Sequence, residues 1–201
     1  MSAEPTLDVS RLPAGALDHR ALLWWGTFWM IVIEAAVFAL ILVSYAYLRL
    51  TGAAWPSGPE AAPGLGLPTL GLVLLLASRV PMRRAAEGAV RGAGPETARR
   101  LGLGLALALA FLVLRIIDWR ALPYRWDTHP FGSLVWTILG LHTAHVVTAI
   151  LENGVLVLLL RLGYTAHEQR LGVVTGGPYW DFVVFSWVPL YVAVYIAPRF
   201  V

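Results

Sequence analysis

This sequence of 201 residues contains no cysteine and no lysine, and charged residues of any kind are scarce. Without cysteine, the chain has neither a disulfide framework nor a thiolate metal site. Charged residues make up only 13% of the chain, against about 25% in a typical soluble domain. The hydrophobic fraction is 58% and the mean hydropathy is +0.70. Together these values predict an integral membrane protein of one domain.

A nucleic-acid footprint and a secretory leader are also missing. All 15 basic residues are arginines, and they are spread between the ends of apolar stretches rather than gathered in one basic run. Nucleic acid is therefore not an expected partner. Residues 1–20 lack a short apolar stretch with a cleavage site, so we interpret them as a polar tail rather than a signal peptide.

Five mainly apolar stretches predict an all-α, polytopic membrane bundle. A helix needs about 20 such residues to cross the hydrocarbon core, at a rise of ~1.5 Å per residue. Helices are the expected form because lipid leaves every backbone polar group to be satisfied within its own segment. The predicted bundle occupies residues 21–201, after the tail 1–20, with spans at about 21–48, 68–84, 100–119, 130–161 and 178–198.

The arginines also predict an orientation. Ten of the 15 fall in the tail and in the second and fourth connections, among them the connection from Arg79 to Arg100. Because basic residues accumulate on the cytoplasmic side of membrane proteins, we expect a cytoplasmic N-terminus and a C-terminus outside. The expected location is a bacterial inner membrane.

Ionisable residues inside the spans are candidates for function. A charge at the bilayer centre costs about 2.5–3.5 kcal/mol, so Glu34 must either be protonated or face a polar partner. His142, His145 and Glu152 fall on one stripe of the fourth span, and a Glu34–His145 contact is expected if the first and fourth spans are neighbours. Two interpretations stay open, namely helix packing and proton handling.

A metal site is not predicted at these histidines. Two histidines three residues apart could share a metal, but zinc requires at least a third ligand. Haem ligation is not expected either. At the outer end of the third span, Arg115, Asp118 and Arg120 are interpreted as a paired anchoring cluster. Asp181 is expected to cap the start of the fifth span.

Three segments carry a family resemblance. WWGTFWMIVIEAAVFALILVSYAYLRL (residues 24–50) has a mid-membrane Glu followed by Phe and a Tyr-containing end. FGSLVWTILGLHTAHVVTAILENGVLVLLL (131–160) contains a G-x-H-x-x-H-V pattern, and YWDFVVFSWVPLYVAVY (179–195) closes the chain. In this order the segments resemble subunit III of the haem–copper (cytochrome c) oxidases. The pattern is matched by Gly140, His142, His145 and Val146.

The resemblance implies a short, five-helix, divergent member of that family, whose larger members have seven helices. Asp181 and Val184 stand where the family commonly has His and Asp, and Arg115 stands where Gln is frequent. The implied protein carries no haem or copper itself and packs against the catalytic subunit I, with subunit II as a further expected partner. It would support assembly, bind phospholipid and sustain proton uptake while its partner reduces O2.

Other functions are compatible with the same residues. A related protein that accompanies nitric oxide reductases has the same helix pattern. A small proton channel or transporter would use Glu34, His145 and Glu152 as a relay. A third class, an intramembrane metal enzyme, would retain metal after purification.

Overall fold

The computed structural model describes residues 17–52, 63–92 and 94–200. Within these residues all regular structure is helical. Most of the predicted tail, residues 1–20, lies outside the described part of the chain. The helices are α1 (Leu22–Thr51), α2 (Gly66–Arg91), α3 (Pro95–Arg120), α4 (Pro130–Arg161) and α5 (His167–Tyr191), followed by a π-helical turn η1 (Val192–Ile196) and a 3₁₀ turn η2 (Ala197–Phe200).

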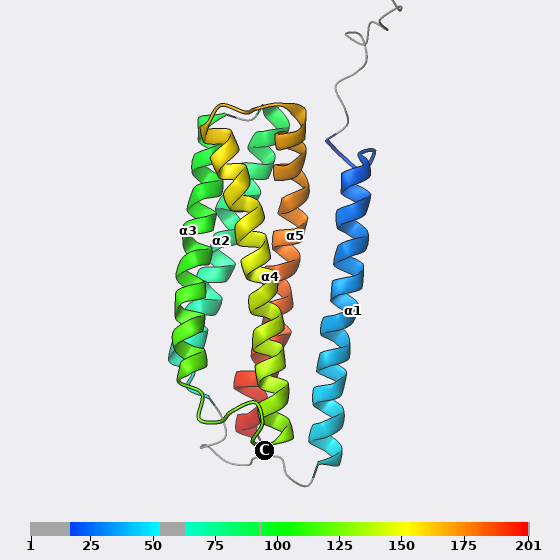
Figure 1. The fold of residues 1–201 in the computed structure, drawn as a ribbon, viewed down its shortest axis with the longest axis vertical. Helices are drawn as coiled ribbons and strands as arrows, with labels where there is room; N and C mark the ends of the chain where they lie inside the picture. Colours follow the sequence, from blue (N-terminus) through cyan, green and yellow to red (C-terminus); the bar gives the residue numbers. More distant parts are fainter. Residues whose placement is uncertain (1–16, 53–62, 93, 201) are drawn as a thin grey trace, which may run out of the picture.

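Helices α2 to α5 form a bundle, and α1 stands along one side of it (Figure 1). The most extensive contact joins α2 and α3, and α5 packs against α2, α4 and α1. The start of α1, the α2–α3 connection and the α4–α5 connection lie at one end of the bundle, whereas the C-terminus lies at the opposite end (Figure 1).

Small residues let the helices approach closely. A Cβ atom at Gly104 of α3 would lie 2.7 Å from Met82 Cγ, and one at Gly177 of α5 would lie 3.4 Å from Ala86 Cβ. Lipid offers no hydrophobic drive toward helix association, so close van der Waals packing at small residues stabilises the bundle. Gly104 thus allows α3 to pack closely on Met82 of α2.

Four helices in the described residues are long and apolar enough to cross a membrane, namely α1, α3, α4 and the continuous stretch from α5 to η2. Helix α2 is 26 residues long, but its second half carries Arg79 and four further charged residues. Large apolar side chains are exposed along α1, where Phe38 and Tyr45 are the buried residues. The chain is therefore an integral membrane protein.

The last helix begins earlier than expected. The predicted span starts at 178, but α5 starts at His167 and contains both Pro178 and Pro189. Each proline removes only one backbone donor, and neighbouring helices hold the segment straight enough to continue. As a result Asp181 lies in the middle of α5, and its predicted role as an N-terminal cap is wrong.

Candidate functional site

Glu34 and His145 meet at the seam between α1 and α4. His145 Nε2 lies 3.5 Å from Glu34 Oε2, and both side chains are partly buried. Phe38, one turn further along α1, packs its ring 4.9 Å from the His145 ring and covers the pair from one side. The expected contact between the first and fourth helices is therefore present.

The hydrogen bond of His145 to the backbone determines which ring nitrogen carries a proton. His145 Nδ1 is 2.7 Å from the carbonyl oxygen of Leu141. Because a carbonyl only accepts, Nδ1 must carry a proton, which leaves Nε2 of a neutral ring as an acceptor. A favourable contact with Glu34 then requires one shared proton, held either on His145 Nε2 or on the carboxyl group. The geometry suits a site that holds or passes one proton.

His142 lies three residues before His145 on α4 but bonds to a different helix. Its side chain is fully buried, and Nε2 is 3.0 Å from the carbonyl oxygen of Val183 in α5. The ring lies 4.6 Å from the ring of Trp187. The two histidines that resemble the family motif thus have different bonding partners, although the Phe38 ring lies near both, at 6.3 Å from His142 and 4.9 Å from His145. His142 joins α4 to α5, while His145 faces α1.

Glu152 is exposed on α4, two turns closer to the α4–α5 connection than His145. The residue that relates it to the seam is Tyr179 of α5, which interacts electrostatically with both Glu34 and Glu152. Tyr179 is buried and was not singled out from the sequence.

A second polar cluster lies inside the bundle near its C-terminal end. Arg115 and Asp118 of α3 are 4% and 7% exposed. The Tyr195 hydroxyl of η1 donates to Asp118 Oδ2. The Arg115 guanidinium sits 3.6 Å from the centroid of the Trp187 ring and 5.0 Å from that of Phe111. A cation is thus held between aromatic faces with a carboxylate one turn away.

Arg120 does not belong to this cluster. Its side chain is exposed at the end of α3, and within the described residues it forms no ion pair with Asp118. Arg115 and Asp118 point inward because they lie three residues apart on the face of α3 that packs on α4 and α5. The predicted three-residue anchor is therefore divided into a buried pair and a separate surface arginine.

Asp181 forms a two-point ion pair with Arg79 of α2. The distances are 2.7 Å from Arg79 Nε to Oδ1 and 3.1 Å from Nη2 to Oδ2. Arg79 lies inside α2 rather than in the connection where the sequence analysis placed it. The pair ties α2 to α5, and each side chain is about a third exposed, at 31% and 32%.

One sequence signal for the inner cluster was available. Trp187, Tyr191 and Tyr195 recur every four residues, which places them on one helical face. In the structure their rings lie 5.3–6.5 Å apart. Tyr191 also reaches α2, where its hydroxyl is 2.6 Å from Thr69 Oγ1. The ion pair of Arg79 and Asp181 had no comparable signal, because 102 residues separate its partners.

Comparison with known proteins identifies the relatives of this chain. The family model described as cytochrome c oxidase subunit III matches residues 17–198. The chain is 27% identical to cytochrome c oxidase subunit 3 of Synechocystis sp. over 187 residues, covering 90% of this chain and 78% of that protein. It is 30% identical to the subunit 3 of Trichophyton rubrum over 174 residues, covering 82% and 64%. Against the subunit 3 of Pylaiella littoralis it covers 53% of the relative's length. The chain thus spans about half the length of some relatives that it matches.

Proposed function

This chain belongs to the cytochrome c oxidase subunit III family, and from this premise we propose that it is a non-catalytic membrane subunit of a respiratory haem–copper oxidase. In this role it supports the assembly and sustained turnover of a complex that reduces O2 and translocates protons. The observation that carries the proposal is the family match over residues 17–198, which includes both the Glu34–His145 seam and the inner cluster.

The expected partners are the catalytic subunit I, subunit II and membrane phospholipid. The haem and copper of the complex belong to the partner subunits. In support, the two membrane histidines already direct a ring nitrogen at carbonyl oxygens of Leu141 and Val183. Within the described ranges no group of three or more metal-ligating side chains comes together. The described His142 and His145 are thus already engaged by the backbone, which supports the assignment of haem and copper to the partner subunits.

The proposed topology has five spans in a bacterial inner membrane. They are the four apolar helical stretches named above and, in addition, α2. At 26 residues and ~1.5 Å per residue, α2 is long enough to cross with its charged end at the surface. Arg91, Arg99 and Arg161 lie at the bundle end that holds the start of α1, which favours a cytoplasmic location for that end. Reporter fusions after Arg91 and after Thr128 should then report opposite sides. The same side for both would contradict five spans.

The first test of the oxidase assignment is to identify the subunits that bind this chain. Native mass spectrometry of the complex, extracted gently from the membrane, should detect a haem-carrying partner of many helices bound to this chain. O2 consumption by that preparation separates an oxidase from a nitric oxide reductase. Isolation of the chain with no haem-carrying partner, together with proton transport by the chain alone in liposomes, would overturn the proposal.

The second test addresses the seam. In the intact complex, Glu34→Gln removes the shared proton but preserves the shape of the side chain. If the seam assists proton supply, the variant oxidase should start at the normal rate and lose activity during continued turnover. His19→Gln is a control, since it changes a histidine outside the helices. Unchanged sustained activity and proton stoichiometry would confine Glu34 and His145 to packing.

A further inference from the structure

A histidine side chain holds the first turn of α4. His129 is the N-cap residue of this helix, and its Nδ1 accepts a hydrogen bond of 2.8 Å from the backbone N–H of Gly132. Gly132 is buried, so its N–H depends on this cap rather than on water. Because a backbone N–H only donates, Nδ1 must be free of a proton. The ring that caps α4 is therefore the neutral one, with its proton on Nε2.

The first turns of α4 in turn hold the connection that precedes them. Ser133 Oγ donates to the carbonyl oxygen of Trp126 at 2.6 Å. One turn further along α4, Trp136 Nε1 donates to the carbonyl oxygen of Tyr124 at 3.1 Å. The α3–α4 connection is therefore fastened by side chains of α4, and its shape depends on the part of the helix that His129 caps.

A cavity of about 510 Å³ lies beside the cap and gives the ring room to move. His129 and Asp127 line it, together with Leu48 near the end of α1 and side chains of the first turns of α4. Asp127 is paired with Arg125 at 3.3 Å, but the two side chains are 44% and 74% exposed, and a carboxylate can accept from more than one donor. His129 thus neighbours the Gly132 N–H, which suits a neutral ring, and the Asp127 carboxylate, which suits a charged one.

Other ionisable groups around His129 and its neighbour Tyr124 do not stabilise a charged ring in the cap. In the described residues they are Tyr124 and Arg125 of the connection, Tyr45 and Arg49 of α1, and Asp118 of α3. Tyrosine is neutral near pH 7, and Asp118 already accepts from Tyr195. Neither arginine favours a second positive charge, and the positive end of the α4 dipole opposes one at the N-cap. Asp127 is thus the acid that suits a protonated ring.

We propose that His129 is an acid-sensitive cap of α4 that controls the α3–α4 connection. When the ring takes a second proton from the surrounding water, Nδ1 becomes a donor and the bond from the Gly132 N–H is lost. The ring then turns into the cavity toward Asp127, and the first turns of α4 loosen their hold, through Ser133 and Trp136, on the connection. This device requires only the inserted chain. Under the proposed topology and function, it responds to acid on the side that receives translocated protons.

Hydrogen exchange of the full chain in lipid nanodiscs tests the cap, independently of the oxidase assignment. The protection factor of the Gly132 amide is its intrinsic exchange rate divided by the measured rate, which removes the general pH dependence of exchange. Protection should be highest at about pH 8, where histidine is neutral, and lower at about pH 5. The expected loss is about 5-fold, which corresponds to one N-cap hydrogen bond. The nitrogen NMR shift of His129 Nδ1 should change over the same pH range.

Two variants separate titration from packing. His129→Asn keeps a side-chain oxygen that accepts from the Gly132 N–H but does not titrate, so protection should remain high at both ends of the pH range. Asp127→Asn removes the charged partner of the protonated ring, so the loss of protection should move to lower pH.

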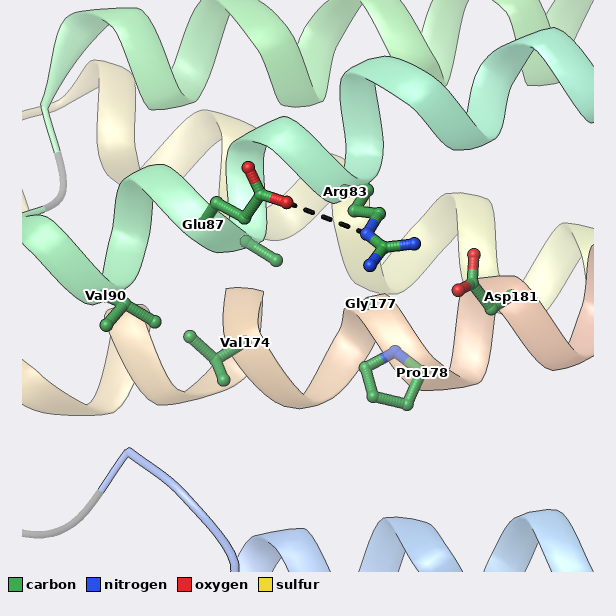
Figure 2. A pocket seen from close by; sticks show the side chains of 8 residues that line it. Arg83, Glu87, Val90, Val174, Gly177, Pro178 and Asp181 are labelled. Atoms are coloured by element: carbon green, nitrogen blue, oxygen red, sulfur yellow. Dashed lines mark ion pairs between the residues drawn. The ribbon is translucent and has the colours of Figure 1, made fainter.

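The opposite end of the bundle supplies a control. A cavity of about 550 Å³ lies there between α2 and α5, and Figure 2 shows Arg83 and Glu87 facing each other at its rim. None of its lining residues is a histidine, so Glu87→Gln should reproduce the wild-type pH dependence at Gly132. Wild-type protection that does not change with pH, a wild-type response in His129→Asn, or an unchanged midpoint in Asp127→Asn would each overturn the proposal.

Discussion

The seam of α1 and the interior of the α2–α5 bundle both contain ionisable side chains, but they hold them differently. At the seam, the side chains of Glu34 and His145 are 23% and 13% exposed and lie 3.5 Å apart. In the interior, Arg115 and Asp118 are 4% and 7% exposed, and aromatic rings and the Tyr195 hydroxyl surround them. The seam is thus the less buried of the two sites, and the Leu141 carbonyl oxygen and Tyr179 are its other partners.

The difference shows where each site can act. A buried charge is tolerable only while its partners remain, because its desolvation cost is several kcal/mol per ion. The inner cluster therefore links α3 to Trp187 of α5 and Tyr195 of η1 through side chains. The seam lies under α1, the α-helix with the fewest buried residues, and its two groups can share one proton. Function that involves protons is consequently expected at the seam rather than in the interior.

The largest effect is expected when the inner cluster loses its acid. Asp118→Ala leaves Arg115 buried without a carboxylate and removes the acceptor of Tyr195. An uncompensated buried charge of this kind costs about 3–5 kcal/mol. Reversible unfolding in mixed detergent micelles should reveal a loss of that size in the free energy of unfolding.

Arg120→Gln is the matched control for this prediction. It changes an arginine two residues away that is exposed, so the free energy of unfolding should move by no more than ~0.5 kcal/mol. Equal losses in Asp118→Ala and Arg120→Gln would mean that the three residues act as one surface anchor, which the sequence alone suggested.

The sequence predicted those features of the fold that depend on local composition. Apolar stretches of spanning length predicted five helices, and the structure has helices at all five places. Residues that favour a turn in water were less informative. The predicted last span began at 178, but in the structure Gly176 and Gly177 let α5 extend further back, close to α4 and α2.

The candidate site was only partly predictable for a related reason. Depth along a helix follows from residue number, so Glu34 and His145 could be matched before the fold was known. Direction around the helix axis depends on the neighbours. His142 and His145 therefore separated toward α5 and α1, and Arg120 separated from Arg115. Tyr179 and the ion pair of Arg79 with Asp181 required the tertiary arrangement itself.

A moderate effect is expected at the seam. Glu34→Ala leaves His145 Nε2 without its partner in a partly buried position, and an unsatisfied polar group of this kind costs about 1–3 kcal/mol. Glu34→Gln should lose less, because the amide can still donate to Nε2. A double-mutant cycle with His145→Ala in the unfolding assay isolates the pair. Strictly additive losses would mean that Glu34 and His145 do not interact.

The smallest effect is expected at the ion pair of Arg79 and Asp181. This pair has well-defined two-point geometry but is more exposed than the inner cluster. Its geometry is two-pronged, but both side chains are about a third exposed, and pairs accessible to water contribute about 0.2–1 kcal/mol. Arg79→Gln, Asp181→Asn and the double variant should therefore each lose no more than about 1 kcal/mol of unfolding free energy. High salt should weaken the wild-type pair further, because mobile ions screen exposed charges. A loss of unfolding free energy close to that of Asp118→Ala, with no dependence on salt, would contradict this prediction. It would mean that the ion pair is shielded from water in the same way as the buried cluster.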